Sequence, residues 1–381
     1  MTSLTSTMRV AIAAESFFPR VNGVSNSVAH VVKHLKSEGI AAEIIAPGLY
    51  PGSEFHGTPV HRVRSVNLPG VHDFDISMTT TSSIITTLEK FQPTLVHLAS
   101  PFVLGSRVMQ ACRILDIPTV AVFQTDVAGY ARHYGLSSMS FIADGIVRRI
   151  HSSATLNLAP STSAQKYLQG LGISQPLLWG RGVDHEVFNP EQRSETLRSS
   201  WQADNKIVVG YCGRLAPEKG IGMMKYLQGD SRVKLVIIGD GPDRKNLEIL
   251  LPNAIFTGRL TGHELGSAMA SLDVLIAPGE LETFCQVIQE GMAAGTPVIA
   301  PAIGGPLDLI SHEVNGLLYP PGDAAEMVRQ VDRLVADADL RNEISGVAHD
   351  RVQSRTWSAL GRELVGHYQS ASRGLLLPAA A

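Results

Sequence analysis

The chain has 381 residues, which is longer than most single domains, and a prior of roughly 100–200 residues per domain predicts two domains. Its 32 Lys and Arg residues nearly balance its 35 Asp and Glu residues, and the basic residues are scattered, which disfavours a nucleic-acid-binding protein. The three cysteines, Cys112, Cys212 and Cys285, are far apart and show no metal-ligand spacing. This argues against a disulfide framework or a structural zinc site and fits a reducing cytoplasm.

No apolar run approaches the roughly 18 residues needed to span a bilayer. Residues 1–8 lack the basic and apolar regions of a secretory signal. We therefore expect a protein that is soluble or that contacts a membrane only peripherally.

The first half of the chain alternates short apolar runs with helical patterns. Helices are expected up to about Ser37, from about Thr80, and up to about Leu115. Strands are expected at 9–14, 42–47, 94–98, 119–123 and 157–162. Strands that alternate with helices in this way predict a parallel sheet.

The loop after the first strand contains Gly23, which could supply a tight turn that lets the backbone approach a diphosphate or an acceptor. An ordinary connection between strand and helix is the simpler interpretation of this loop taken alone. No Gly-x-Gly-x-x-Gly fingerprint follows the strand, which disfavours a dinucleotide-dependent oxidoreductase.

Asp126 and Tyr130 follow the strand at 119–123, where open α/β sheets collect ligand groups, so they are candidates for the acceptor side. Arg148 and Arg149 lie on the next helix, beside a helically spaced apolar set. This pattern is compatible with a membrane-contacting surface, although a core stripe with a solvated face is the favoured interpretation. The apolar set is Phe141, Ile142, Ile146 and Ile150.

Glycines and a proline interrupt the alternation between Trp179 and Pro190, and we expect the domain boundary there, with domains at 1–185 and 186–355. An apolar stripe of Trp357, Leu360, Leu364 and Tyr368 predicts a last amphipathic helix from Thr356 to about Ala371. A second series of strands begins near Ile207, Val233, Ala254, Val274 and Pro297.

Glu282 and Glu290 are eight residues apart and flank the start of an expected helix. The amides of Phe284, Cys285 and Gln286 are expected among the unpaired N–H groups of its first turn, which favours a phosphate. Ionised carboxylates accept hydrogen bonds from vicinal hydroxyls, so together these features indicate a nucleotide sugar. Taken alone, Glu282 as a helix cap and Glu290 as a solvated charge would explain the pattern.

Arg214 and Lys219 lie in one loop after the strand at 207–211, and Gly213 and Gly220 allow close backbone approach. Two cations at the carboxyl end of a strand suit a diphosphate, although in an isolated loop they would be read as solvated charges. The two loops after the next strands contain Gly239, Gly241 and Leu260. They are expected to line a nucleobase pocket or to be ordinary turns.

In this order, the Gly23 loop, Gly182-Val-Asp, Gly213-Arg-Leu-x-x-Glu-Lys-Gly, Gly239-x-Gly-Pro and Glu282-x7-Glu290 resemble the signature of retaining glycosyltransferases of family 4. The resemblance implies a GT-B fold of the α/β class, with two Rossmann-like domains facing a cleft. It also implies that the C-terminal segment 356–381 returns to the N-terminal, acceptor-side domain, while the C-terminal domain binds the nucleotide sugar. Within the family, the chain looks most like the GDP-mannose-dependent α-mannosyltransferases that act on glucuronosyl-diacylglycerol.

The resemblance further implies metal-independent transfer with retention and no cofactor, in which Arg214, Lys219 and the helix terminus after Glu282 stabilise the leaving diphosphate. Asp126 is the acceptor-side candidate for the catalytic set. The donor would be GDP-mannose. The acceptor would be a membrane glycolipid with an acidic sugar, and the enzyme would lie peripherally on the inner face of the cell membrane. Candidate partners for a uronate carboxylate are Arg62, Arg64, Arg132 and His133.

Two departures from the family pattern stand out. Gln124 occupies a position where many relatives carry histidine, and Cys285 replaces a common glycine. The open alternatives are a UDP-sugar-dependent glycolipid or phosphatidylinositol glycosyltransferase, a GT-B-shaped nucleotide-sugar epimerase, and a catalytically silent sugar-binding module. A glycosidase using Glu282 and Glu290 as its two carboxylates is a further alternative, but it would leave the paired cations without a purpose. The sequence carries no indication of oligomeric state.

Overall fold

The computed structural model describes residues 8–20, 22–48, 53–67, 75–129 and 137–373. These residues form two compact units. Unit 1 runs to Arg181 and includes the segment from Trp357 onward, and unit 2 is Gly182–Thr356. The first change of unit falls a few residues before the expected division at 185/186, and the second follows the expected one at 355/356 by a single residue.

Unit 1 is built on one mainly parallel sheet, in the order β10-β9-β8-β7-β1-β2-β4-β3. Within this sheet, as far as the structure describes it, only the edge pair β3–β4 is antiparallel. The central strands are buried along almost their whole length, as expected for parallel strands covered on both faces. The strands are β1 (Arg9–Ala14), β2 (Ala41–Pro47), β3 (Ser53–Phe55), β4 (Thr58–Val63), β7 (Leu95–Ala99), β8 (Thr119–Val122), β9 (Leu156–Ala159) and β10 (Leu177–Leu178), beside a ribbon of β5 (Ser65–Asn67) and β6 (Asp75–Ser77).

The helices of unit 1 begin at local capping signals. Asn22 caps α1 and forms a reciprocal capping box with Ser25, and Thr80 caps α2. These caps satisfy backbone N–H groups that the first helical turn leaves open. The helices are α1 (Gly23–Ser37), α2 (Thr81–Phe91), α3 (Val103–Ile114), α5 (Ser137–His151), α6 (Thr162–Gly170) and α14 (Trp357–Ser372).

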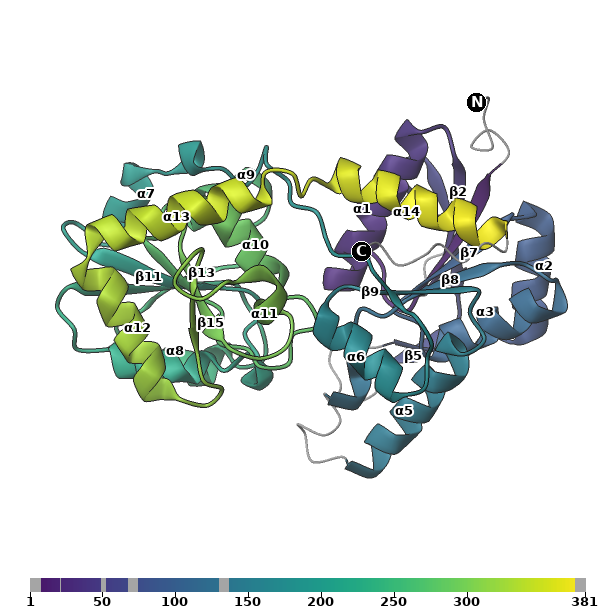
Figure 1. Cartoon of the computed structure of the whole chain (residues 1–381), viewed down its shortest axis with the longest axis horizontal. Helices are drawn as coiled ribbons and strands as arrows, with labels where there is room; N and C mark the ends of the chain where they lie inside the picture. The colour runs from purple at the N-terminus through teal and green to yellow at the C-terminus, as the bar shows by residue number, and fades with distance from the viewer. Residues whose placement is uncertain (1–7, 21, 49–52, 68–74, 130–136, 374–381) are drawn as a thin grey trace. The chain divides into compact units, whose positions relative to one another are not determined.

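The C-terminal helix α14 packs on unit 1, as the sequence predicted, and lies alongside α1 (Figure 1). Trp357 stacks on His30 with ring centroids 4.2 Å apart. The buried hydroxyl of Tyr368 lies 2.5 Å from Nδ1 of His97 on β7. Burial lowers the pKa of His97 to about 3, so its ring is neutral at pH 7. The helix is therefore an integral part of the core of unit 1.

The expected core stripe of α5 is divided between core and solvent. Ile150 is buried and Ile146 partly buried, but Phe141 and Ile142 are 77% and 65% exposed. The favoured interpretation of the whole set as a core stripe was therefore wrong for its first two members. The reason is that Ala143 and Val147 supply the buried contacts along this part of the helix.

Unit 2 contains a parallel sheet in the order β13-β12-β11-β14-β15-β16, which is the 3-2-1-4-5-6 arrangement of doubly wound nucleotide-binding folds. The reversal of strand order lies between β11 and β14, and ligands of such sheets collect beyond the carboxyl ends there. The strands are β11 (Ile207–Cys212), β12 (Val233–Ile238), β13 (Ile255–Gly258), β14 (Val274–Ile276), β15 (Val298–Pro301) and β16 (Leu317–Tyr319).

Helices cover both faces of this sheet, so its core forms two layers. One layer includes Ile288 and Met292 of α10, and the other includes Met327 and Val331 of α12. The helical segments are η1 (Pro190–Gln192), α7 (Glu195–Ser200), η2 (Pro217–Lys219), η3 (Ile221–Leu227), α8 (Arg244–Leu250), α9 (Gly262–Ala270), α10 (Gln286–Ala293), α11 (Pro306–Leu309), α12 (Ala324–Ala336) and α13 (Ala338–Val352).

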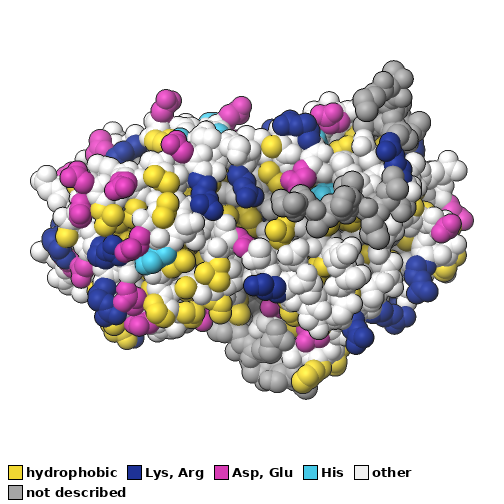
Figure 2. Space-filling model, in the orientation of Figure 1, with side chains coloured by type: hydrophobic (Ala, Val, Ile, Leu, Met, Phe, Trp, Pro, Cys, Tyr) yellow, Lys and Arg dark blue, Asp and Glu magenta, His cyan; other side chains and the backbone are white. Residues whose placement is uncertain are grey.

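The surface mixes charges of both signs. On the face shown in Figure 2, basic and acidic side chains are interspersed among hydrophobic ones, without a continuous basic stripe among the coloured residues. Within the described ranges, no helix combines the length and the apolar character that crossing a bilayer requires.

Candidate functional site

Most predicted donor-site residues of unit 2 lie in loops at the carboxyl edge of its sheet, whereas Gln286 and Glu290 lie on α10. Some of these loops bind one another through their backbones. Leu215 N donates to Asp240 O over 2.9 Å, which joins the loops after β11 and β12. Gly305 N donates to Glu282 O over 2.9 Å, which joins the loops after β15 and β14. Two pairs of loops at the sheet edge are therefore each joined by a backbone hydrogen bond.

Several glycines at this edge are required by close backbone contact. A Cβ on Gly239 would lie 1.9 Å from the carbonyl oxygen of Gly213, and one on Gly241 would lie 2.3 Å from that of Leu215. Gly239 also has φ of 137°, which disfavours other residues. Leu260, predicted in the same nucleobase wall, is partly buried against the core. The structure thus gives both glycines a packing role, and their contact with a base stays a prediction.

Arg214 is held at both ends. Its carbonyl oxygen accepts a 2.9 Å hydrogen bond from the hydroxyl of Tyr211, and its guanidinium forms an ion pair with Glu218. The Glu218 side chain is almost fully buried, whereas that of Arg214 is 42% exposed. A guanidinium has five N–H donors, so Arg214 can keep this pair and still donate to a phosphate. Glu218 was not among the candidates, although the motif containing it was recognised.

Lys219 and Glu282 are brought together by the fold. Lys219 Nζ lies 2.6 Å from Glu282 Oε1, and their side chains are only 18% and 22% exposed. Gly279 leaves room beside them, because a Cβ there would approach Glu282 Oε1 to 3.3 Å. The sequence assigned these two groups to different parts of a ligand, and the structure makes them direct partners. An ammonium has three donors, so this pairing leaves capacity for a diphosphate.

Helix α10 begins later than expected, at Gln286, so the prediction that the amides of Phe284 and Cys285 lie within its first turn was wrong. Phe284 is buried in the core of unit 2, and Cys285 is the N-cap with φ of 67°. This left-handed backbone is the conformation that glycine adopts freely and that other residues rarely adopt. The first-turn amides are those from Gln286 onward.

Glu290 and Glu282 both act on the Cys285 thiol. Burial raises the pKa of Cys285 well above its usual range, the Glu282 carboxylate adds to this, Lys219 opposes it, and Glu290 raises it further. Burial and Glu290 likewise raise the pKa of Cys212. The two carboxylates and the lysine therefore lie near enough to this thiol to influence its pKa. Both thiols stay protonated at neutral pH and are not nucleophiles.

Gln286, another predicted ligand contact, donates from Nε2 to Gly182 O over 2.9 Å. Its Oε1 is buried and accepts no hydrogen bond from the described residues. An unpaired buried acceptor costs free energy unless a donor reaches it. A ligand hydroxyl is one such donor.

The described acceptor-side candidates of unit 1 mostly contact other parts of unit 1. Asp126 Oδ1 accepts a 2.7 Å hydrogen bond from Gly129 N, so the carboxylate caps the turn that follows β8. Gly23 is the first residue of α1, and the space around it admits a Cβ at ordinary contact distance, so the expected tight turn does not depend on this glycine. Arg62 donates to carbonyl oxygens of Phe18 and Pro47.

Three further candidates, Tyr130, Arg132 and His133, lie outside the described residues. Arg64 is exposed. A catalytic role for Asp126 and a uronate contact by any arginine stay predictions.

Sequence reasoning missed a buried carboxylate at the end of β1. Glu15 accepts hydrogen bonds from the backbone N–H groups of Phe102 at 2.5 Å, Leu104 at 3.1 Å and Gly105 at 2.8 Å, and so caps α3. Burial raises the pKa of Glu15, while these three donors lower it. A charged residue directly after a buried strand was the available signal.

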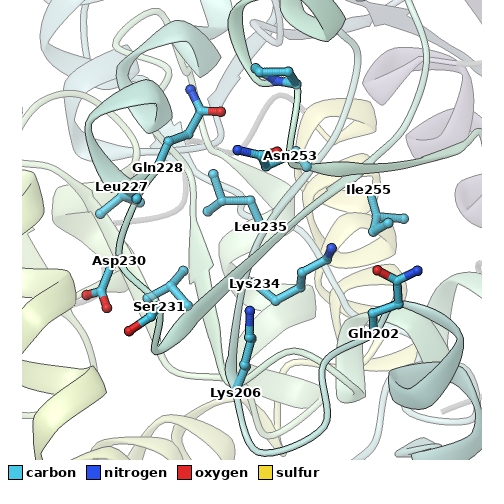
Figure 3. A pocket seen from close by; sticks show the side chains of 14 residues that line it. Gln202, Lys206, Leu227, Gln228, Asp230, Ser231, Lys234, Leu235, Asn253 and Ile255 are labelled. Carbon is cyan, nitrogen blue, oxygen red and sulfur yellow. The ribbon is translucent and has the colours of Figure 1, made fainter.

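A cavity of about 520 Å³ lies at the opposite edge of the unit 2 sheet, where β11 and β12 begin. Lys206 and Lys234 extend toward it, and Gln202, Gln228 and Asn253 surround it (Figure 3). None of the predicted site residues lines this cavity. Among the residues that the structure describes, no cluster of three or more His, Cys, Asp or Glu side chains is arranged to hold a metal ion.

Comparisons with known proteins agree with this architecture. Residues 21–187 match the family model of Glycosyltransferase Family 4, and residues 193–350 match that of Glycosyl transferases group 1. The crystal structure of Anabaena Alr3699/HepE in complex with UDP-glucose superimposes with a TM-score of 0.77 at 21% identity, covering 95% of this chain and 100% of that one. That of WaaG, a glycosyltransferase involved in lipopolysaccharide biosynthesis, gives 0.73 at 15% identity, covering 94% and 99%.

Curated relatives extend over nearly the whole chain. The GDP-mannose-dependent alpha-mannosyltransferase of Corynebacterium glutamicum is 43% identical, covering 95% of this chain and 88% of the relative. That of Mycobacterium tuberculosis is 44% identical, covering 95% and 97%. The sulfoquinovosyl transferase SQD2 of Arabidopsis thaliana is 31% identical, covering 97% and 75%.

Two doubly wound, mainly parallel sheets and the likeness to these solved structures define the GT-B fold. The chain belongs to glycosyltransferase family 4.

Proposed function

We propose that this protein is a GDP-mannose-dependent α-mannosyltransferase that transfers mannose, with retention of configuration, to a membrane glycolipid. The observation that carries the proposal is the ion pair that joins Lys219, in the loop of Arg214, to Glu282 at the carboxyl edge of the unit 2 sheet. It occurs in a chain at least 43% identical to enzymes named for that donor and that transfer.

Donor binding follows from the chemistry of this edge. Arg214 and Lys219 place two cations where a diphosphate carries its charge, and the start of α10 adds backbone donors. Glu290, together with the buried Oε1 of Gln286, offers acceptors for sugar hydroxyls. Glu282 contributes to hydroxyl binding while it orients Lys219.

Transfer then requires stabilisation of charge that grows on the leaving diphosphate. The bond between the anomeric carbon and the phosphate oxygen breaks as an acceptor hydroxyl attacks from the same face, and the hydroxyl proton passes to the departing phosphate oxygen. Negative charge on the diphosphate increases along this path, so Arg214 and Lys219 bind the transition state more strongly than the bound donor. These two cations perform the task that a divalent metal performs in other transferases.

A peripheral membrane position is supported by α5. Phe141 and Ile142 are exposed on this helix, and Arg148 and Arg149, also exposed, lie two turns further on. Exposed apolar side chains combined with cations suit an anionic lipid surface. We propose that this helix contacts the inner leaflet, where the glycolipid acceptor resides. An acidic sugar on the acceptor would pair with an arginine, and Arg64 is the exposed, described candidate.

Radiolabelled mannose supplied as GDP-mannose tests the transfer. Purified protein should move the label onto glucuronosyl-diacylglycerol in detergent, and much less onto the neutral glucosyl analogue. Arg214→Ala should abolish transfer, whereas Lys245→Ala, which removes an exposed cation from α8, should not. Equal labelling of both lipids would remove the argument for an acidic acceptor, and preference for a UDP-sugar would favour a sulfoquinovosyl- or glucosyl-type transferase.

Vesicle flotation tests the membrane contact. The double variant Phe141→Ser/Ile142→Ser should lose binding to vesicles that contain anionic lipid. The matched control is Ile249→Ser, because Ile249 is an 81% exposed apolar residue on α8 of unit 2. Equal binding by wild type and the double variant would refute the assignment of α5.

A further inference from the structure

Arg181 is a buried arginine that joins two loops at the carboxyl edge of the unit 1 sheet. It is only 7% exposed. One guanidinium nitrogen donates to Gly23 O over 2.6 Å, and the other donates to Gln124 Oε1 over 3.0 Å. Gly23 begins α1, and Gln124 follows β8, so one side chain at the end of unit 1 fixes both segments.

The chemistry of the guanidinium determines how Gln124 is oriented. Arginine has only donors, so the amide atom that faces Arg181 must be the carbonyl oxygen. The amide NH2 group of Gln124 therefore points away from Arg181. Gln124 is itself only 6% exposed, and rotation of its amide would replace a hydrogen bond by a contact between two donors.

We infer that Arg181 is a positioning residue that holds the Gln124 amide with its N–H donors toward the substrate, where Gln124 donates a hydrogen bond to a sugar-bearing ligand. This inference rests on the proposed function, because it needs a substrate at the carboxyl end of β8. It assigns Gln124 the role of a hydrogen-bond donor whose direction is fixed by a neighbouring cation and does not depend on a protonation state.

Gln124→Glu separates this role from a structural one. The carboxylate keeps an acceptor toward Arg181 and forms a charge-assisted hydrogen bond with it, so the melting temperature of unit 1 should stay the same or rise. The variant loses the donor, so kcat should fall at least tenfold. A merely structural pair predicts instead that the variant retains its activity as well as its stability.

A double-mutant cycle tests whether Arg181 acts through Gln124. Arg181→Met should lower kcat about tenfold in the wild-type background and less than threefold in the Gln124→Met background. Arg181→Lys, which keeps a cationic hydrogen-bond donor, should recover part of the loss. Equal losses in both backgrounds would overturn the inference, and so would full activity of Gln124→Glu. If Arg181→Met does not fold, Arg181→Lys takes its place in the cycle. Transfer of mannose by the wild-type protein is measured first. If the wild-type protein shows no transfer, the proposed function is wrong, and that result is independent of the role of Arg181.

Discussion

The Lys219–Glu282 ion pair provides the sharpest separation of stability from activity. Its 2.6 Å contact joins two side chains that are 18% and 22% exposed. A hydrogen bond between charged groups contributes roughly 1.5–3 kcal/mol, and partial solvation places this pair near the lower half of that range, about 2 kcal/mol. Lys219→Met removes the bond and leaves a largely buried carboxylate without this partner.

We therefore expect Lys219→Met to destabilise unit 2 by about 2 kcal/mol. For a domain of this size, each kcal/mol shifts the melting temperature by about 2–4 °C, so its transition should fall by about 4–8 °C. Adding Glu282→Gln removes the stranded charge and should restore at least half of that shift. Differential scanning calorimetry, which follows the transition of each unit, measures both variants.

Activity should not follow stability in this series. Loss of Lys219 removes stabilisation of the leaving diphosphate, and removal of one preorganised electrostatic group costs about 10²–10³-fold in kcat. The single variant and the double variant should both show this loss at saturating donor. The reasoning is refuted if the double variant melts no higher than Lys219→Met, or if Lys219→Met keeps near-normal kcat.

Four further outcomes are expected. Gly239→Ala should abolish transfer because its Cβ would lie 1.9 Å from Gly213 O. Gly346→Ala, in open space on α13, should instead gain about 0.5–1 kcal/mol in stability and keep full activity. Kinetics and calorimetry of both variants check this. Tyr368→Phe should cost unit 1 about 1 kcal/mol by removing the hydrogen bond to His97, seen as a lower melting temperature with donor affinity unchanged. Folding lowers the pKa of His97 from 6.5 to about 3, so the unfolded state binds more protons than the folded state between these pH values. Unit 1 should therefore lose stability as the pH falls from about 6.5 toward 3. A His97→Gln variant whose stability falls equally steeply with pH would contradict this. Transfer should survive EDTA, and loss of turnover that magnesium or manganese restores would overturn the assignment of the two cations to the diphosphate.

The alternation of strands and helices was predictable from local patterns. Continuous apolar runs such as Val274–Ile276 indicated strands that are buried on both faces, and the apolar stripe through Leu360 and Leu364 predicted α14. Helix starts were less predictable. The start of α10 moved to Gln286 because Cys285 adopts a left-handed backbone, for which a cysteine gives no sequence signal.

The sequence by itself determined that the chain folds as two doubly wound units and that Arg214, Lys219 and Glu282 follow strands that end at one sheet edge. The physical reason is that parallel strands end on the same side, so residues that follow such strands converge. Only the tertiary structure decided which of these residues touch, as in the pairing of Lys219 with Glu282 across 63 positions of sequence. It also decided that Arg181 joins Gly23 to Gln124 and that Phe141 faces solvent. Side-chain partners are set by how loops from separate strands pack, and residue spacing within one segment contains no information about that packing.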